Sequence, residues 1–225
     1  MKYTQPYTPP TLVVDAVIFQ IVNNQLQVVL IERAADPFKG MWALPGGYNA
    51  VGETTRDALQ RVVQEKAGIN LSADLSYVEQ LYTFDTVARD PRGHAVSVTY
   101  MGCGRNVEWS KSEAHTASFP VDNLPKLAYD HADIIQYAHK RLAAKLTYTN
   151  AVYAFLPKRF TLSELQAAYQ SVLGRELDKR NFRKKFLSLG LIHETDEMKR
   201  EGAHRPARLY EFNATELEAL SRSFD

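Results

Sequence analysis

The residue types best suited to chemistry in this chain are the carboxylates and basic side chains interleaved between Gly47 and Ile69, in the segment GYNAVGETTRDALQRVVQEKAGI. Thr54, with Asp57 three residues later, matches a helix-capping box, and Gly68 can end the helix. On that helix positions 62, 65 and 66 share one face, because residues three and four apart are neighbours. The face carries Val62, Glu65 and Lys66.

The chemistry that such a face could support is the binding of a divalent metal. Mg²⁺ takes hard oxygen ligands in near-octahedral geometry, and of these side chains only Glu65 offers one. Lys66 places a fixed cation where a second cation would bind. At ~4 Å and an effective dielectric near 20, like unit charges repel by about 4 kcal/mol. We therefore expect metal-assisted hydrolysis to be severely impaired, with no catalytic and no metal-ligating residue.

The spacing of this segment resembles the signature of the Nudix hydrolases. The positions that match are Gly47, Glu53, Arg61, Val63, Glu65, Gly68 and Ile69. The resemblance implies a loop, a helix and a second loop, with helix carboxylates that hold a metal against a diphosphate. It also implies that Glu53 and Arg61 pair to brace the loop. Two positions depart from the signature, because the expected glutamates are Val62 and Lys66.

Two interpretations of these departures remain open. One is a Nudix fold kept as a ligand sensor, in which a Lys66 ammonium could help hold the ligand's phosphates in the metal's place. The other is an enzyme that recruits a carboxylate from elsewhere, for example Glu53, Glu79 or Asp85.

Length and composition limit the function classes. A chain of 225 residues allows one large or two small domains, and a hydrophobic content of 45% supports real cores. The lone Cys103 excludes an internal disulfide framework and fits a reducing cytoplasm. The start, MKYTQPYTPP, does not resemble a signal peptide, and no run of about 18 apolar residues predicts a membrane span. We expect a cytoplasmic protein.

The first part of the chain alternates strand and helix patterns. Residues 12–18 and 27–33 predict a hairpin, 77–84 and 95–102 predict two more strands, and 129–146 has helical periodicity. These elements fit the α/β/α sandwich of the Nudix fold. We assign residues 1–147 to a Nudix-like ligand-sensing domain.

Three further segments, DAVIF, RDPRGHAVSVTY and LAYDHADII, resemble the ADP-ribose-type branch of the family. The resemblance implies ADP-ribose or a related nucleotide as the effector, with no cofactor required. Arginine suits a diphosphate through bidentate bonds, and an aromatic ring can stack on a base. The candidate ligand-binding residues are Arg33, Trp42, Gly46, Gly47, Glu65, Arg92 and His94. Plainer roles remain open: Trp42 as core, Arg92 as a solvated turn residue and His94 as a structural or surface histidine.

Residues 148–225 predict a second domain. Residues 150–156 favour a short helix that ends at Pro157, and Thr161 to Glu164 form a capping box for a helix that Gly174 closes. Asp178 can cap a third helix, closed by Gly190, and β-like runs follow at 191–194 and 208–212. Three helices and a hairpin in this order resemble a winged helix, a variant of the helix-turn-helix.

The third helix has the layout of a DNA-recognition helix. Phe182, Phe186 and Leu189 form its buried stripe, and basic residues fall on the other face. Arginine can read guanine, asparagine can read adenine, and lysines suit phosphates. The candidate DNA-binding residues are Lys179, Arg180, Asn181, Arg183, Lys184 and Ser188 on the helix, and Lys199, Arg200, His204, Arg205 and Arg208 in the hairpin region. The alternatives are a merely solvated charged face and docking to another protein.

An impaired Nudix domain followed by a winged helix resembles the Nudix-related transcriptional regulators of NAD metabolism, over nearly the whole chain. The resemblance implies a repressor of NAD biosynthesis or salvage genes that ADP-ribose releases from a double-stranded operator. We expect a homodimer, because helix-turn-helix proteins usually read paired half-sites. The alternatives are an ADP-ribose diphosphatase with an accessory winged helix and a protein-binding scaffold without a ligand pocket.

Overall fold

The computed structural model describes residues 8–109, 112–200, 206–214 and 216–220. Its helices and strands follow in chain order: β1 Thr11–Val22, β2 Gln25–Glu32, β3 Trp42–Ala43, β4 Gly46–Tyr48, α1 Thr55–Ala67, α2 Leu71–Asp74, β5 Tyr77–Phe84, β6 Ala95–Cys103, β7 Thr116–Pro120, α3 His131–Tyr148, the 3₁₀ helix η1 Ala151–Phe155, α4 Leu162–Leu173, α5 Lys179–Leu187, β8 Ile192–Lys199 and β9 Ala207–Phe212. The order is that of an α+β chain whose mixed sheet precedes a small helical unit with a hairpin.

The first half is built on a seven-stranded sheet in which β3, β2, β1, β6 and β5 lie side by side. β4 pairs with β1, and β7 pairs with β2. The hairpin of β1 and β2 turns at Asn23 and Asn24, whose φ angles of 51° and 60° suit the tight turn that joins twisted strands. β1 and β6 run parallel, which brings Asp15 beside Thr99.

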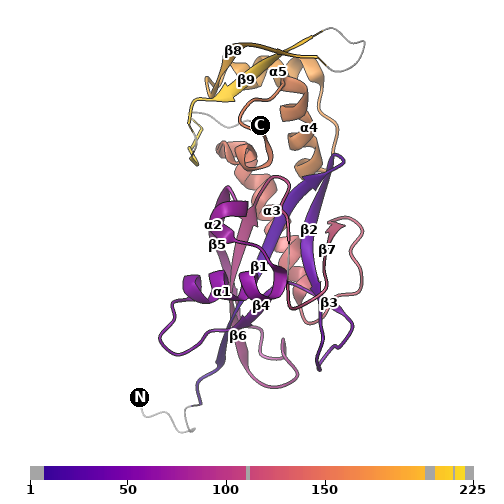
Figure 1. The fold of residues 1–225 in the computed structure, drawn as a ribbon, viewed down its shortest axis with the longest axis vertical. Helices are drawn as coiled ribbons and strands as arrows, with labels where there is room; N and C mark the ends of the chain where they lie inside the picture. Colours follow the sequence, from indigo (N-terminus) through magenta and orange to yellow (C-terminus); the bar gives the residue numbers. More distant parts are fainter. Residues whose placement is uncertain (1–7, 110–111, 201–205, 215, 221–225) are drawn as a thin grey trace.

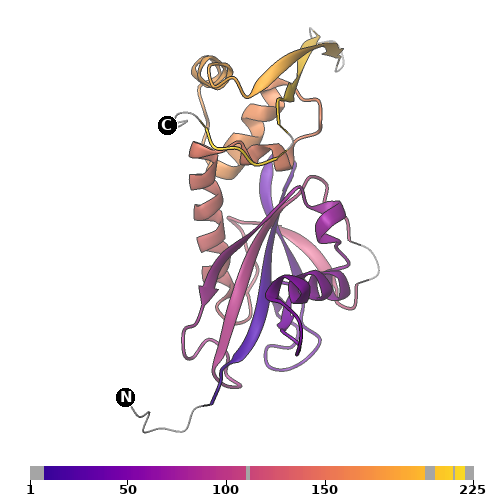
Figure 2. The same ribbon diagram turned by 90° about the vertical axis from the view of Figure 1, so that its left-hand side faces the viewer.

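Alternating side chains of β1 separate the two faces of the sheet. Val17 and Phe19 pack in the same cluster as Ile134 and Leu142 of α3, whereas Ile18 packs with Leu59 of α1. This is the period of two that a strand imposes when both of its faces are covered. Figure 2 shows α1 on one side of the sheet and α3 on the other. The predicted α/β/α sandwich is therefore confirmed.

Most local predictions are confirmed, because their signals act within one turn of chain. Thr54 and Asp57 form the reciprocal capping box of α1, and Gly68 ends it with φ 68°. Thr161 and Glu164 do the same for α4.

Several expected boundaries were wrong by a few residues. α3 begins at His131 rather than at residue 129, because Tyr129 has a φ of 55° that a helix cannot use. The short helix expected over residues 150–156 is a 3₁₀ helix over Ala151–Phe155. β8 continues to Lys199, so that residue belongs to the strand and not to the loop after it.

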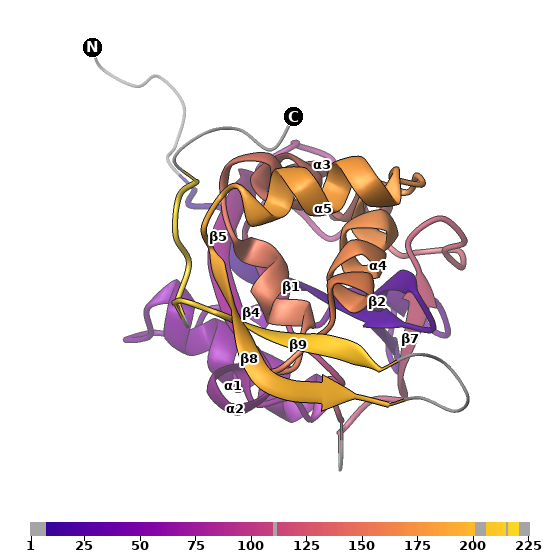
Figure 3. The ribbon, with the colours of Figure 1, turned by 90° about the horizontal axis from the view of Figure 1, so that it is seen from above.

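The second half forms a winged helix at one end of the molecule. α4 and α5 pack through Tyr169, Phe182 and Phe186, which are all buried. β8 and β9 make an antiparallel hairpin, and Phe160 bridges it to the start of α4 through Tyr210. Figure 1 shows α5, β8 and β9 at the end of the molecule opposite to β4, and Figure 3 shows α5 and the hairpin together from that end.

The two halves are in direct contact through α3. Leu146 of α3 belongs to the same buried cluster as Tyr169 of α4. His139 of α3 lies 2.7 Å from the Val172 carbonyl of α4. Ser171 of α4 donates to the carbonyl of Asn24, in the turn of the first hairpin, at 2.8 Å. The winged helix is thus packed on the sheet unit rather than tethered to it.

Candidate functional site

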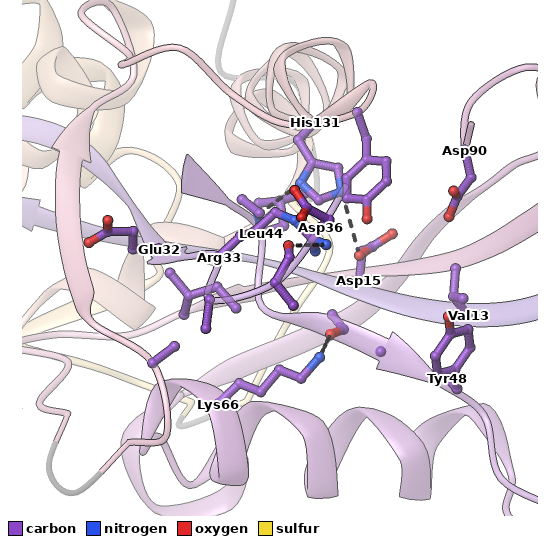
Figure 4. A pocket seen from close by; sticks show the side chains of 18 of the residues that line it. Val13, Asp15, Glu32, Arg33, Asp36, Leu44, Tyr48, Lys66, Asp90 and His131 are labelled. Atoms are coloured by element: carbon purple, nitrogen blue, oxygen red, sulfur yellow. Dashed lines mark hydrogen bonds and ion pairs between the residues drawn. The ribbon is translucent and has the colours of Figure 1, made fainter. Parts of the chain in front are cut away.

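A cleft of about 360 Å³ opens above β4 in the first half. Its floor is the Gly46–Gly47 strip, and its walls come from residues 32–36, the loop with Arg89 and Arg92, and the start of α3. Charged side chains of both signs line the walls, among them Asp15, Arg33, Lys66 and Arg92, so the cleft can hold a polar, charged ligand. Figure 4 shows this cleft with Arg33, Asp15, His131 and Lys66 around it.

The glycines of the floor leave room for charged groups beneath and beside them. A Cβ on Gly46 would lie 2.0 Å from Asp15 Oδ1 and 2.9 Å from the carbonyl oxygen of Val14. A Cβ on Gly47 would lie 3.0 Å from Val62 and 3.3 Å from Lys66 Nζ. Close approach therefore requires glycine at position 46, whereas a side chain at position 47 would require small shifts of Val62 and Lys66.

Lys66 reaches the cleft from the last turn of α1. Its Nζ donates to the Gly46 carbonyl at 2.5 Å. The pKa of Lys66 lies below its usual value, mainly because burial penalises the charged form, and next because Arg33 repels it. Asp15, Glu113 and Glu65 act in the opposite direction.

The helix residues that would bind a divalent metal do not fit one. Val62 is buried in an apolar cluster with Val14 and Ala58. Glu65 is 45% exposed and pairs with Arg61 at 3.3 Å, instead of pointing into the cleft. Among the residues that the structure describes, no group of three or more His, Cys, Asp or Glu side chains converges as metal ligands would.

The carboxylates proposed as replacements lie elsewhere. Glu53 pairs with Arg61 at 2.6 Å, and this bond lowers the pKa of Glu53 to about 2. Glu79 pairs with Lys145 of α3, and neither it nor Asp85 lines the cleft. The ion pair of Glu53 and Arg61 braces the loop before α1, in agreement with the prediction.

A buried charge network forms the back wall of the cleft. Arg89 donates two bonds to Asp130, at 2.8 and 2.9 Å, and lies 3.5 Å from Asp15. Ser97 donates to Asp15 at 2.6 Å. His131 Nδ1 accepts from the Leu44 backbone N–H at 2.9 Å, so its proton is on Nε2, which faces Asp15 Oδ1 at 3.8 Å.

The open rim of the cleft carries two arginines and two tyrosines. Arg92 bonds Asp90 at 2.7 Å, Tyr48 Oη at 2.9 Å and Tyr129 Oη at 3.3 Å. Arg33 lies over the ring of Tyr129, 4.9 Å from its centroid. The hydrogen bonds to Asp90 raise the pKa of Arg92, and burial raises that of Tyr129. The rim can therefore offer both cations and aromatic faces to a nucleotide.

Four predicted ligand contacts lie together on this cleft: Arg33, Gly46, Gly47 and Arg92. Trp42, Glu65 and His94 do not line it, and their contacts to a ligand stay predictions. Trp42 packs against Phe119, with ring centroids 4.7 Å apart. Asp15, Arg89 and His131 were missed, although they lie within the segments DAVIF, RDPRGHAVSVTY and LAYDHADII, respectively.

The winged helix presents a basic surface on α5. Lys179, Arg180, Asn181, Lys184 and Ser188 are exposed, whereas Phe182 and Phe186 are buried. Asp178 caps the helix by accepting from the Asn181 N–H at 2.8 Å. Arg183 differs from its neighbours, because it is half-buried and donates to Ser163 of α4 at 3.0 Å.

The hairpin contributes fewer unpaired charges than the sequence suggested. Lys199 pairs with Glu164 of α4 at 2.7 Å, and Arg208 pairs with Glu194 at 2.9 Å. Arg200 is exposed at the end of β8. His204 and Arg205 lie outside the described residues. All of these positions stay predictions as DNA contacts.

Comparison with known proteins identifies both halves. Residues 11–138 match the family model described as NUDIX domain, and residues 152–212 match the one described as NrtR DNA-binding winged helix domain. The chain is 36% identical to the ADPR responsive transcriptional repressor NtrR of Acinetobacter baylyi, over 92% of this chain and 83% of that protein.

Two solved structures are similar to the whole chain and to its first half. The crystal structure of Shewanella oneidensis NrtR complexed with a 27mer DNA has a TM-score of 0.80 and 31% identity, and the match covers 95% of this chain and 99% of that one. The NUDIX domain of the same protein, complexed with ADP ribose, has a TM-score of 0.51 and 30% identity, and that match covers 60% and 90%.

Proposed function

This chain belongs to the NrtR family of transcriptional repressors, which join a Nudix domain to a winged helix, and on that premise we propose that it is a DNA-binding repressor that senses ADP-ribose. Residues 1–147 form the sensing domain, and residues 148–225 bind the operator. The regulated genes are those of NAD biosynthesis or salvage. The protein acts in the cytoplasm as a homodimer.

The observation that carries this proposal is the exposed basic face of α5. Helix α5 lies at the end of the molecule opposite to β4 (Figure 1), the strand that forms the floor of the cleft. A helix held by two buried phenylalanines, with its charges directed outward, can enter a major groove. We assign base reading to Arg180 and Asn181, and phosphate contacts to Lys179, Lys184 and Ser188. Lys199, Arg200, His204, Arg205 and Arg208 would contact phosphates from the hairpin region.

The cleft is the proposed site of the effector. Arg33 and Arg92 would bind the diphosphate, and the aromatic rings of the rim would cover a ribose or the base. Gly46 and Gly47 let the ligand approach the backbone of β4. Trp42, Glu65 and His94 lie outside the lining, and we keep them as proposed ligand contacts.

The cleft residues argue against metal-assisted hydrolysis. Val62 is apolar, Glu65 pairs with Arg61, and Lys66 lies at the floor, so the face of α1 that the Nudix signature uses for metal offers no carboxylate to the cleft. We therefore propose that the protein binds ADP-ribose without cleaving it. Turnover on the order of 1 per second or more, typical of enzymes, would favour the alternative of an ADP-ribose diphosphatase with an accessory domain.

Helix α3 offers a physical link between effector and operator. Its first residue, His131, lines the cleft, and its last turns pack with α4 of the winged helix through Leu146. A shift of α3 on ligand binding would move the winged helix as a body. In a dimer, that shift would change the spacing of the two recognition helices relative to the half-sites.

None of the helices in the described part of the chain has the length and hydrophobicity that a bilayer crossing needs.

A mobility-shift titration tests the function. The duplex is selected by the protein itself from a randomised palindromic pool, and ADP-ribose is then added to the complex. We expect ADP-ribose to release the duplex, and the same sample to contain intact ADP-ribose afterwards. Equal duplex affinity at zero and saturating ADP-ribose, with ligand binding confirmed, would contradict the repressor proposal.

A further inference from the structure

Four basic side chains line the cleft, and they differ in how their charge is balanced. Arg89 is paired with Asp130, and Arg92 with Asp90. Arg33 donates to the carbonyls of Pro37 and Ala35. Lys66 donates to the carbonyl of Gly46. Within the described part of the chain, neither of these last two cations forms an ion pair with a carboxylate.

The unpaired cations face the same space. Lys66 enters it from α1 below β4, and Arg33 enters it from the end of β2 (Figure 4). The absence of a side chain at Gly47 keeps the ammonium accessible, because a Cβ there would lie 3.3 Å from Nζ. Arg33 also repels Lys66 strongly enough to be the second cause, after burial, of its lowered pKa.

Two like charges that approach in a half-buried cleft destabilise the empty protein. An anion with two negative charges placed between them removes that repulsion and gains charge-assisted bonds from both. The diphosphate of a dinucleotide-like ligand has one negative charge on each phosphate group. Its charge therefore complements the two cations better than a neutral sugar or base would.

We propose that Lys66 and Arg33 together bind the diphosphate of the effector in place of a divalent metal, so that the protein senses its ligand without Mg²⁺. The proposal rests on the proposed function, since it concerns the diphosphate of ADP-ribose. Lys66, which stands where the Nudix signature has a metal-binding glutamate, thereby has a ligand-binding role. A second consequence is that inorganic pyrophosphate should compete for the same two cations.

The first experiment uses the unmodified full chain. Calorimetric titration with ADP-ribose is performed in excess EDTA, which removes trace metal, and then in Mg²⁺. We expect dissociation constants that agree within about 2-fold, a difference below 0.5 kcal/mol. An affinity that collapses in EDTA and returns with Mg²⁺ would overturn the proposal, because the metal would then be needed.

The second experiment removes the charge and keeps the length of the side chain. Lys66→Met should weaken ADP-ribose binding on the order of 10- to 100-fold, the range for loss of a hydrogen bond to a charged group. Lys140→Met is the matched control, because Lys140 is exposed on α3 and does not line the cleft. It should bind ADP-ribose as the unmodified chain does.

Two competitors separate a local effect from damage to the fold. Adenosine has no phosphate, so it should compete for the site equally in the unmodified chain and in Lys66→Met. Inorganic pyrophosphate should displace ADP-ribose from the unmodified chain and do so much less well from Lys66→Met. If Lys66→Met keeps the affinity of the unmodified chain for ADP-ribose and pyrophosphate, Lys66 does not bind the diphosphate.

Failure of this proposal is distinguishable from failure of the proposed function. If the unmodified chain binds no ADP-ribose in either buffer, the function itself is contradicted. If it binds ADP-ribose tightly with Mg²⁺ alone, the function survives and the metal-free diphosphate site does not. Should Lys66→Met fail to fold, the comparison of EDTA with Mg²⁺ still decides, because it needs no variant.

Discussion

His131 is a buried imidazole whose surroundings favour its neutral form. Burial lowers its pKa, Arg89 and Arg33 lower it further, and Asp15 and Asp130 act in the opposite direction. The unfolded chain takes up this proton near the ordinary value of 6.5, whereas the folded chain resists it. The contribution of His131 to stability is therefore complete above that pH and is lost as the pH falls toward the lower folded-state pKa.

The lowered pKa of His131 predicts a measurable dependence of the free energy of unfolding on pH. Between pH 7.5 and 5.5, the free energy of unfolding should fall by up to about 1.4 kcal/mol per pH unit from this group. His131→Asn keeps an acceptor for the Leu44 N–H but does not titrate, so its urea midpoint should change less over the same interval. Parallel curves for the two proteins would show that another group causes the pH dependence.

Arg89 and Arg92 allow the stability contributions of a buried and an exposed ion pair to be compared. The Arg89 side chain is 4% exposed and serves both Asp130 and Asp15, whereas that of Arg92 is 45% exposed and serves Asp90. Removing one partner from a buried pair leaves an uncompensated charge. Arg89→Met should therefore destabilise the fold by about 3–5 kcal/mol, and Arg92→Met by about 0–1 kcal/mol.

Urea unfolding followed by circular dichroism measures both variants. Equal midpoints for Arg89→Met and Arg92→Met would mean that the back wall of the cleft is solvated, contrary to its buried geometry.

At the scale of elements, α5 is predicted to supply the salt dependence of operator binding. Lys179→Ala together with Lys184→Ala removes two exposed charges that are assigned to phosphate contacts. For every DNA phosphate that is no longer neutralised, the slope of log K against log salt should become shallower by about 0.9. Lys140→Ala removes an exposed charge from α3 instead and should leave the slope unchanged.

Base reading on the same helix has a different signature. Asn181→Ala should relax sequence preference and weaken operator binding by about 1–3 kcal/mol if that residue reads a base. Binding to an unrelated duplex should hardly change. A uniform loss on both duplexes would instead assign Asn181 to the phosphates.

The caps of α1, α4 and α5 could be predicted from sequence because Thr54, Thr161 and Asp178 act on N–H groups within three residues. The charge network of the cleft could not, because Asp15 and His131 are far apart in the chain and meet only once the sheet and α3 are assembled. The position of the Arg183 side chain could not be predicted from the sequence either. Helical periodicity placed it on the outer face, but the neighbouring α4 offers Ser163 and draws the guanidinium inward.

At the scale of the whole molecule, effector and operator should influence each other equally. ADP-ribose should change operator affinity, and operator should change ADP-ribose affinity, by the same factor, equivalent to about 1–3 kcal/mol. Mobility shift measures the first factor and calorimetry with the duplex present measures the second. Unequal factors would indicate that ADP-ribose also binds outside the cleft.

The packing of α3 against α4 provides a variant of that test. His139→Ala removes the bond of 2.7 Å to the Val172 carbonyl and touches neither the cleft nor the exposed face of α5. It should reduce the coupling factor while each ligand alone binds as before. Undiminished coupling would show that the signal does not depend on this bond.

The apolar cluster of Val14, Ala58 and Val62 also bears on the order in which this lineage could lose or regain a metal. A mutation of position 62 to glutamate buries a carboxylate but finds the ammonium of Lys66 four residues along the helix, a favourable spacing. A mutation of position 66 to glutamate first would instead remove that ammonium and add an acid near Asp15 and Glu113. Glutamate at position 62 is therefore the easier first substitution toward a hydrolase. By the same logic, when a hydrolase becomes a sensor, this glutamate is lost after the one at position 66.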